Sequence, residues 1–202
     1  MARVDAFTRF LEGPGRSVMR DGGIVRILAI SGSLRGASSN TAVIDAAVRV
    51  APLGVEVSVY SGLADVPPFN PDLDTDTAPI AVVRFRAALE ACDAILICSP
   101  EYAHGVSGVL KNALDWVVGS GELIDKPIAV INASTRATHA DASLRETLTT
   151  MSARVIEDAS ITIPLAGSEH DPNRIAGDVH LSRLLRASLV ALARAARVAA
   201  VR

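Results

Sequence analysis

From residue 24 onward, stretches with the apolar pattern of a β-strand alternate with stretches whose apolar residues have the spacing of an α-helix. Continuous apolar runs and strictly alternating stretches predict five strands, at 24–30, 54–60, 93–99, 127–133 and 155–163. Apolar positions at helical spacing predict five helices, at 39–51, 80–91, 107–118, 139–153 and 175–200. Because apolar strands that alternate with helices are typical of buried parallel sheets, the pattern predicts an α/β sheet covered by helices on both faces.

Five strands joined by right-handed crossovers suit a doubly wound, flavodoxin-like parallel sheet with strand order 2-1-3-4-5. The stretch 65–79 is rich in proline and aspartate and predicts an irregular loop. Residues 1–22 carry only a weak helical pattern and are expected to be an N-terminal extension. Residues 23–202 are therefore predicted to form a single domain.

Composition narrows the classes of function. The 202 residues carry a formal net charge of −2, and neither a basic nucleic-acid footprint nor a polybasic membrane patch is visible. No apolar run approaches the roughly 20 residues of a membrane span, and the N-terminus lacks a signal-peptide pattern. Cys92 and Cys98 lack metal-ligand spacing, and the histidines form no metal-spaced cluster. These features predict a cytoplasmic protein with reduced core cysteines that binds no metal, nucleic acid or membrane.

Ligands of such a sheet bind at the carboxyl ends of the strands, where the strand order reverses. One loop expected there is 31–40, "SGSLRGASSN", which leads into a helix N-terminus, a place that favours anions. Gly32 would let the backbone approach a ligand, and Arg35 offers a guanidinium fork that matches a phosphate. Short polar donors come from Ser33, Ser38, Ser39 and Asn40.

Two well-known phosphate loops are excluded, because neither GxxxxGK[ST] nor GxGxxG occurs here. A structural alternative stays open, in which Ser38 or Ser39 only caps the helix and Gly36 only serves a turn. A cap explains one serine and leaves Arg35 and Asn40 unexplained. The composition of the loop therefore favours an anion site.

The second loop at this edge, 99–106, favours a flat ring. Pro100 stiffens its start, Tyr102 or His104 would flank a ring face, and Gly105 permits close approach. The apolar residues of the helix that follows, Trp116 among them, have the spacing of core residues. No GxSxG elbow and no evident acid–base pair of carboxylates is present, so a bound cofactor is expected to carry the chemistry.

The chain resembles the NADPH-dependent FMN reductase family of flavodoxin-like proteins in two motifs. The first is G-S-x-R-x-x-S-x-N at 32–40, and the second is P-E-Y … G-x-L-K-N-A-x-D-W at 100–116. The resemblance implies that the first loop holds the FMN phosphate, that the ring lies against 100–105, and that the loop 132–140 adds contacts. The implied FMN-binding residues are Ser31, Ser33, Arg35, Ser38, Ser39, Asn40, Pro100, Glu101, Tyr102, Ala103, His104, Gly105, Ser134 and Arg136.

The resemblance also implies an oxidoreductase that works by ping-pong. FMN would take hydride from NADPH, or from NADH, and pass it to a quinone, azo compound, free flavin or metal oxyanion, with no catalytic side chain. Arg136 is expected to steer the phosphates of the nucleotide. A homodimer or homotetramer is implied, with contacts through the helices that begin at Ser107 and near His139.

Two other functions are compatible with the sequence. One is a flavodoxin-like electron carrier or redox-sensing flavin-binding protein without NAD(P)H turnover. A net charge of −2 argues mildly against a carrier, which usually docks through a strongly acidic face. The other, a binder of a non-flavin phosphate ligand, would leave the loop that carries Tyr102 without a role.

Overall fold

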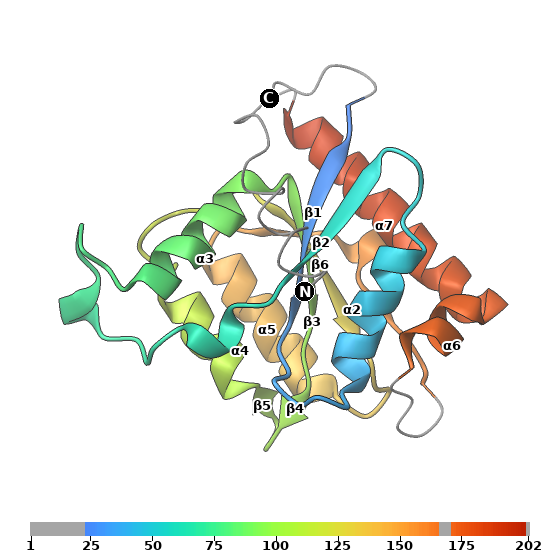
Figure 1. Cartoon of the computed structure of the whole chain (residues 1–202), viewed down its shortest axis with the longest axis horizontal. Coiled ribbons are helices and arrows are strands. Elements are labelled where there is room, and N and C mark those ends of the chain that lie inside the picture. The colour runs from blue at the N-terminus through green and yellow to red at the C-terminus, as the bar shows by residue number, and fades with distance from the viewer. Residues whose placement is uncertain (1–22, 166–170, 201–202) are drawn as a thin grey trace.

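The computed structural model describes residues 23–165 and 171–200, so the expected extension at 1–22 lies outside the described residues. Its central sheet is parallel (Figure 1). The strands lie in the order β2 (Val55–Tyr60), β1 (Val25–Ser31), β3 (Ala94–Cys98), β6 (Pro127–Asn132) and β7 (Arg154–Val155). A further strand, β8 (Ile161–Thr162), also pairs with β6. This arrangement confirms the flavodoxin-like α/β fold and its order 2-1-3-4-5, in which β7 and β8 take the fifth place.

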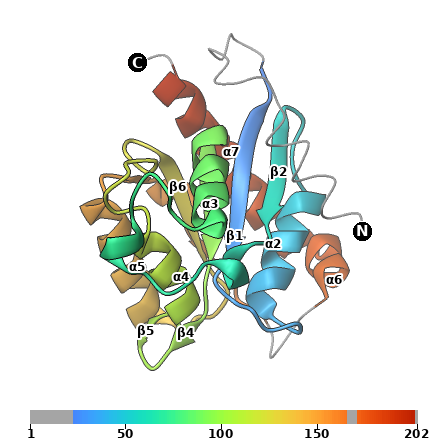
Figure 2. The ribbon, with the colours of Figure 1, turned by 60° about the vertical axis from the view of Figure 1, so that its left-hand side comes forward.

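Helices cover both faces of the sheet (Figures 1 and 2). One face carries α3 (Ile80–Ala91), α4 (Gly108–Asp115) and α5 (Thr138–Thr150), and the other carries α2 (Ser39–Arg49), α6 (Pro172–Gly177) and α7 (Val179–Ala200). Along β1, Leu28 and Ile30 pack on the first face, whereas Ile27 and Ala29 pack on the second. The apolar run thus fills two cores, because successive side chains of a strand point to opposite faces.

The fifth strand is not the continuous one predicted at 155–163. It is interrupted by a 3₁₀ turn, η3 (Glu157–Ala159), that separates β7 from β8. Ser160 explains the break: its hydroxyl accepts the Val130 N–H at 3.0 Å and donates to the Ile156 carbonyl at 2.9 Å. A serine hydroxyl that takes over ladder bonds in this way competes with regular strand pairing.

Other boundaries also differ from the prediction. The helix predicted at 175–200 is two helices, because Asp178 is extended and its carboxylate accepts the N–H groups of His180 and Leu181 at the start of α7. The irregular loop at 65–79 contains the 3₁₀ turn η2 (Pro71–Leu73), and η1 (Leu63–Asp65) ends at its start. The loop 99–106 contains an unpredicted hairpin of β4 (Glu101–Tyr102) and β5 (Gly105–Val106).

The two cysteines and the tryptophan are core residues, as predicted. Cys92 and Cys98 are free and buried, and Trp116 has no exposed surface.

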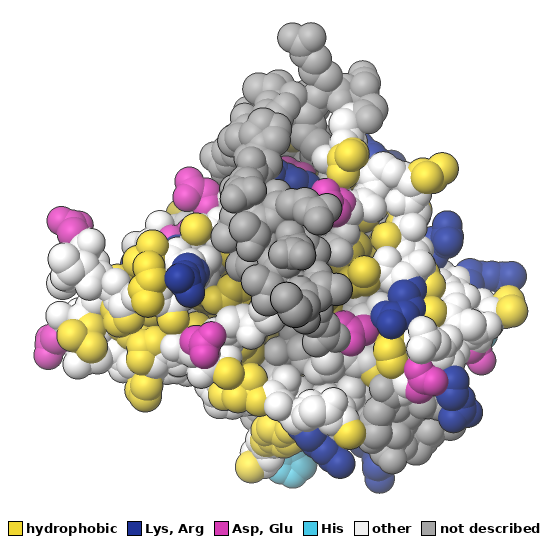
Figure 3. Space-filling view, viewed as in Figure 1, with side chains coloured by type: hydrophobic (Ala, Val, Ile, Leu, Met, Phe, Trp, Pro, Cys, Tyr) yellow, Lys and Arg dark blue, Asp and Glu magenta, His cyan; other side chains and the backbone are white. Residues whose placement is uncertain are grey.

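The arginines of α7 are exposed, and several Lys or Arg side chains lie on the α7 side of the molecule in the space-filling view (Figure 3). Over the described ranges, no helix has the length and apolar character needed to cross a membrane.

Candidate functional site

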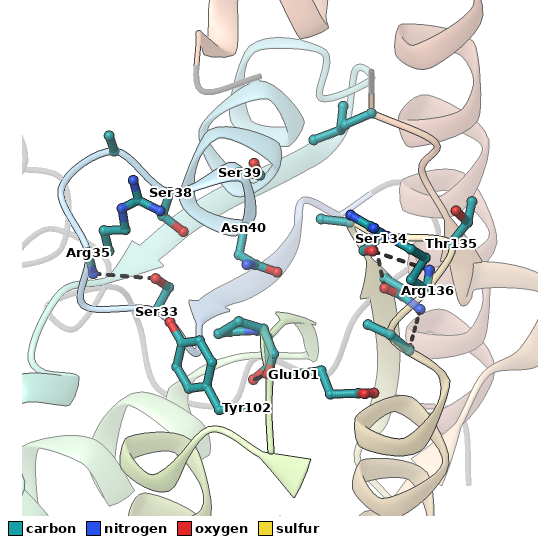
Figure 4. Close-up of a pocket in the computed structure, with 17 residues that line it drawn as sticks. Ser33, Arg35, Ser38, Ser39, Asn40, Glu101, Tyr102, Ser134, Thr135 and Arg136 are labelled. Atoms are coloured by element: carbon teal, nitrogen blue, oxygen red, sulfur yellow. Dashed lines mark hydrogen bonds between the residues drawn. The ribbon is translucent and has the colours of Figure 1, made fainter. Parts of the chain in front are cut away.

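A cleft of about 670 Å³ opens at the carboxyl ends of β1, β3 and β6. That volume lies within the range of roughly 300–1,000 Å³ that is usual for small-molecule sites. Three loops form its walls: 33–40 after β1, 99–102 after β3, and 132–137 after β6 (Figure 4). The predicted residues that line it are Ser33, Arg35, Ser38, Ser39, Asn40, Pro100, Glu101, Tyr102, Ser134 and Arg136.

Four predicted residues do not line the cleft: Ser31, Ala103, His104 and Gly105. Ser31 lies beneath the first loop, and the other three lie in the far part of the hairpin. Several lining residues were not singled out by name. Asn132, Ala133, Thr135 and Ala137 belong to the loop that the family resemblance indicated, and Ser99 begins the predicted loop 99–106, while nothing in the sequence pointed to Leu165.

The first loop is held by its own hydroxyl groups. Ser31 Oγ lies 2.9 Å from Thr41 Oγ1 and accepts the Ser33 N–H at 3.3 Å, and Ser33 Oγ accepts the Arg35 N–H at 3.3 Å. Ser38 is the N-cap of α2 and accepts the Thr41 N–H at 3.4 Å. Ser38 therefore caps the helix, but the cap uses only an acceptor position of its hydroxyl, whose proton is still available to a ligand in the cleft. The cap also leaves the other polar residues of the loop to be explained.

The start of α2 fits a phosphate. No acidic residue lies in its first turn, so nothing there neutralises the positive end of the helix dipole that faces the cleft. The Arg35 guanidinium is exposed at the rim of the same loop. Hydroxyl, amide and guanidinium donors around a helix N-terminus suit a phosphate monoester such as that of FMN. Among the described residues, no group of three His, Cys, Asp or Glu side chains could hold a metal ion.

Gly32 has a packing role in addition to the predicted approach to a ligand, which stays a prediction. A Cβ atom there would lie 2.4 Å from Ser99 Oγ and 2.7 Å from Ser99 Cβ. The Ser107 hydroxyl also donates to the Gly32 carbonyl at 2.7 Å. The exits of β1 and β3 are thus packed directly on each other, and this contact requires the glycine.

The helical part of the second family motif, residues 108–116, lies away from the cleft. Asn112 accepts the Phe69 N–H at 2.8 Å and donates to the Pro67 carbonyl at 2.9 Å. Trp116 Nε1 donates to the same Pro67 carbonyl at 2.8 Å. Lys111 and Asp115, four residues apart on α4, form an ion pair. This block therefore secures the loop before η2 and does not line the site.

The hairpin β4–β5 brings Tyr102 to the edge of the cleft, where its side chain is 57% exposed (Figure 4). The carboxylate of Glu101 points the other way, toward α5, and accepts the Ala140 N–H at 2.8 Å. This bond is the main reason why the pKa of Glu101 lies below its usual value, and His104 and His139 lower it further. His104 lies 3.2 Å from the Glu101 carboxylate, outside the cleft.

The third loop is braced by side chains near its start. Asn132 Nδ2 donates to the Ala137 carbonyl at 2.7 Å, and Asn132 Oδ1 accepts the Ser134 N–H at 2.9 Å. Ser134 Oγ in turn accepts the Arg136 N–H at 3.2 Å. Arg136 is exposed and lies across the cleft from Arg35 (Figure 4). The cleft therefore has a cationic side chain on two opposite walls.

Comparisons with known proteins agree with this geometry. A family model described as NADPH-dependent FMN reductase matches residues 25–167. An NAD(P)H-dependent FMN reductase from Pseudomonas aeruginosa is 32% identical over 173 residues, which cover 83% of this chain and 93% of that relative. A probable NADPH:quinone oxidoreductase from Oryza sativa subsp. japonica is 41% identical over 116 residues, which cover 54% of this chain and 56% of that relative.

A solved structure is also similar over most of the fold. FerB from Paracoccus denitrificans, described as a flavoenzyme NAD(P)H:(acceptor) oxidoreductase, superimposes with a TM-score of 0.68 at 26% sequence identity. The match covers 86% of this chain and 97% of that chain.

Proposed function

This chain belongs to the NADPH-dependent FMN reductase family, and on that premise we propose that it reduces a quinone with electrons from NADPH. It is an oxidoreductase with FMN as its cofactor and NAD(P)H as its reductant. The observation that carries the proposal is the uncompensated N-terminus of α2, which opens with Arg35 and short donors onto the cleft.

Side chains of the first loop would hold the FMN phosphate: Ser33, Arg35, Ser38, Ser39 and Asn40. The walls from Pro100 to Tyr102 and from Asn132 to Ala137 would hold the ring. When bound, FMN supplies the redox chemistry, since it accepts a hydride and gives up the electrons again. The protein contributes binding, orientation and electrostatic stabilisation, because Glu101, the one carboxylate among the described residues that line the cleft, is engaged with the Ala140 N–H.

The reaction would be ping-pong, with the nucleotide and the acceptor occupying the same opening in turn. The alignment with the Oryza sativa relative, described as a probable NADPH:quinone oxidoreductase, supports a quinone as the acceptor. Azo compounds, free flavin and metal oxyanions are the other acceptors to be compared.

Arg136 would bind a phosphate of the nicotinamide nucleotide. FMN carries one phosphate, and Arg35 with the α2 N-terminus suits it, so the guanidinium on the opposite wall is left for a second anion. An exposed arginine at the mouth of a cleft also raises the local concentration of an anionic substrate. We expect Arg136→Ala to raise the KM for NADPH by roughly tenfold. An equal rise for NADH would point to the pyrophosphate, and a rise for NADPH alone to the 2′-phosphate.

The remaining proposals concern the whole protein. Residues 23–202 would form one FMN-binding domain preceded by an extension at 1–22, and the protein would be cytoplasmic. A homodimer or homotetramer would form through α4 and α5, beside which Val118 is 62% exposed. Sedimentation of the reconstituted protein measures the number of subunits.

A visible spectrum of the protein tests the central proposal. The purified chain is reconstituted with FMN, desalted, and mixed anaerobically with NADPH and then with a quinone. Retained flavin absorbance that bleaches with NADPH and returns with the quinone is the expected result. Retained flavin that does not bleach would indicate an electron carrier, and a colourless protein would reject FMN as the tightly held cofactor.

A further inference from the structure

The turn of the β4–β5 hairpin has an unusual backbone. Both of its central residues have positive φ, 49° at Ala103 and 60° at His104. Two-residue hairpins with positive φ at both positions favour Asn-Gly, because a Cβ atom is disfavoured in this region. Ala103 lacks the local side-chain hydrogen bond by which asparagine compensates. Contacts from outside the turn are therefore needed to hold the hairpin.

The carboxylate of Glu101 supplies two such contacts, one with His104 in the turn and one with α5. One carboxylate oxygen lies 3.2 Å from His104 Nδ1, and the other accepts the Ala140 N–H at 2.8 Å. The ring of His104 also meets the ring of His139 edge-on, with centroids 4.5 Å apart. The hairpin is thus attached to the first turn of α5 through one carboxylate and one pair of rings.

The first turn of α5 depends on this attachment as well. Its N-cap residue is Ala137, which offers no side-chain acceptor for the unpaired N–H groups of the helix. Asp141, the acidic residue of that turn, is paired with Arg145 at 2.7 Å. Glu101 therefore acts as the cap of a helix that starts more than thirty residues later in the chain.

Both segments that Glu101 joins border the cleft. Tyr102, its neighbour in the hairpin, lines one wall, and the loop that ends at Ala137 lines the other. Resting on the function proposed for this cleft, we propose that Glu101 is a positioning residue whose carboxylate binds no ligand itself. It sets the separation between Tyr102 and the wall that carries Ser134 and Arg136.

The contacts of the Glu101 carboxylate with His104 and with the Ala140 N–H form a bridge between the hairpin and α5. Two substitutions separate the effect of this bridge from the effect of the negative charge of Glu101. Glu101→Ala removes both bonds, whereas Glu101→Gln keeps an oxygen for the Ala140 N–H and offers an N–H to His104. Glu146→Ala is the matched control, because it removes an exposed carboxylate from the same helix away from its first turn. Glutamine should therefore rescue what alanine loses, and the control should behave as wild type.

Hydrogen exchange of the flavin-free chain tests the bridge. We expect the Ala140 amide to exchange about tenfold faster in Glu101→Ala, as for the loss of a helix cap, and at close to the wild-type rate in Glu101→Gln. Unchanged exchange of Ala140 in Glu101→Ala would overturn the bridge and the proposal with it.

The visible circular dichroism of bound FMN and the steady-state constants test the positioning. In Glu101→Ala we expect an altered flavin signal and a KM for NADPH raised roughly five- to tenfold, with a smaller change in kcat. Faster exchange at Ala140 with a wild-type flavin signal and KM would show a purely structural cap and overturn the proposal. A wild-type chain that retains no flavin would instead reject the proposed function, while the exchange measurement still tests the bridge.

Discussion

Cys98 Sγ donates to the side-chain oxygen of Asn40 at 3.3 Å, so the end of the central strand β3 is joined to the first turn of α2 below the cleft. The amide oxygen of Asn40 is therefore engaged inside the protein. Its NH₂ group is left to face the cleft, where it suits an anion and not a cation.

Asn40→Asp should separate stability from FMN binding. The carboxylate still accepts from Cys98 and gains from the dipole at the α2 N-terminus, so the flavin-free chain should be at least as stable as wild type. Facing a phosphate, the same charge should weaken FMN binding by roughly tenfold or more. Urea unfolding and a flavin-fluorescence titration measure the two effects. Unchanged affinity would show that the phosphate lies elsewhere.

Arg35→Ala should weaken FMN binding by about five- to tenfold, with a smaller loss in Arg35→Lys. The effect is moderate because the Arg35 side chain is exposed and its interactions are screened by water. Arg84→Ala, at an exposed arginine of α3 outside the cleft, is the control. The same titration measures all three variants, and equal affinities for Arg35→Ala and Arg84→Ala would contradict the phosphate site.

Gly32→Ala should destabilise the fold by about 1–3 kcal/mol, the usual cost of overpacking. The new Cβ would overlap with Ser99, and this cannot be relieved by rotating the hydroxyl alone, since Ser99 Cβ is also too close. Adding Ser99→Gly removes the overlap and should restore most of the stability. Urea unfolding of the single and double variants measures this; equal stabilities would mean that the two strand exits are not in contact.

Stability should fall in alkaline solution because of buried acidic groups. Burial raises the pKa of Cys92 to about 11 and that of Tyr60 to about 12. A thiol of the unfolded chain ionises from about pH 8.5 upward, so the contribution of Cys92 is complete below that pH and is lost as the pH rises toward 11. Urea unfolding between pH 7 and 10.5 should show the decline, and Cys92→Ala should reduce its slope. A slope identical in that variant would exclude Cys92 as a cause.

Most of the fold was predictable because helical and strand periods are local properties of the sequence. The hairpin β4–β5 was missed since its turn, Ala103–His104, lacks the glycine or asparagine that marks such turns. The strand predicted at 155–163 was wrong in its middle because the bonds of Ser160 to Val130 and Ile156 are set by tertiary position.

The candidate site was predictable to a similar degree. The first loop could be recognised from its composition, and its residues line the cleft together with Pro100 and Tyr102. The wall at 132–137 carries no chemistry that local reasoning would single out, and the family resemblance alone indicated it. The hydrogen bond from the Ala140 N–H to the Glu101 carboxylate depends on how two distant loops are placed, so it cannot be predicted from a local sequence pattern.

The interruption between β7 and β8 also bears on self-association. Outer strands with long rows of unpaired N–H and C=O groups are templates on which further chains add and aggregate. Here the edge of the sheet beyond β6 consists of β7 and β8, two strands of two residues each that are separated by η3. These strands are too short to pair stably with a strand of another chain. Within the described sheet, strand-by-strand growth would have to begin at β2, the six-residue strand on the opposite side.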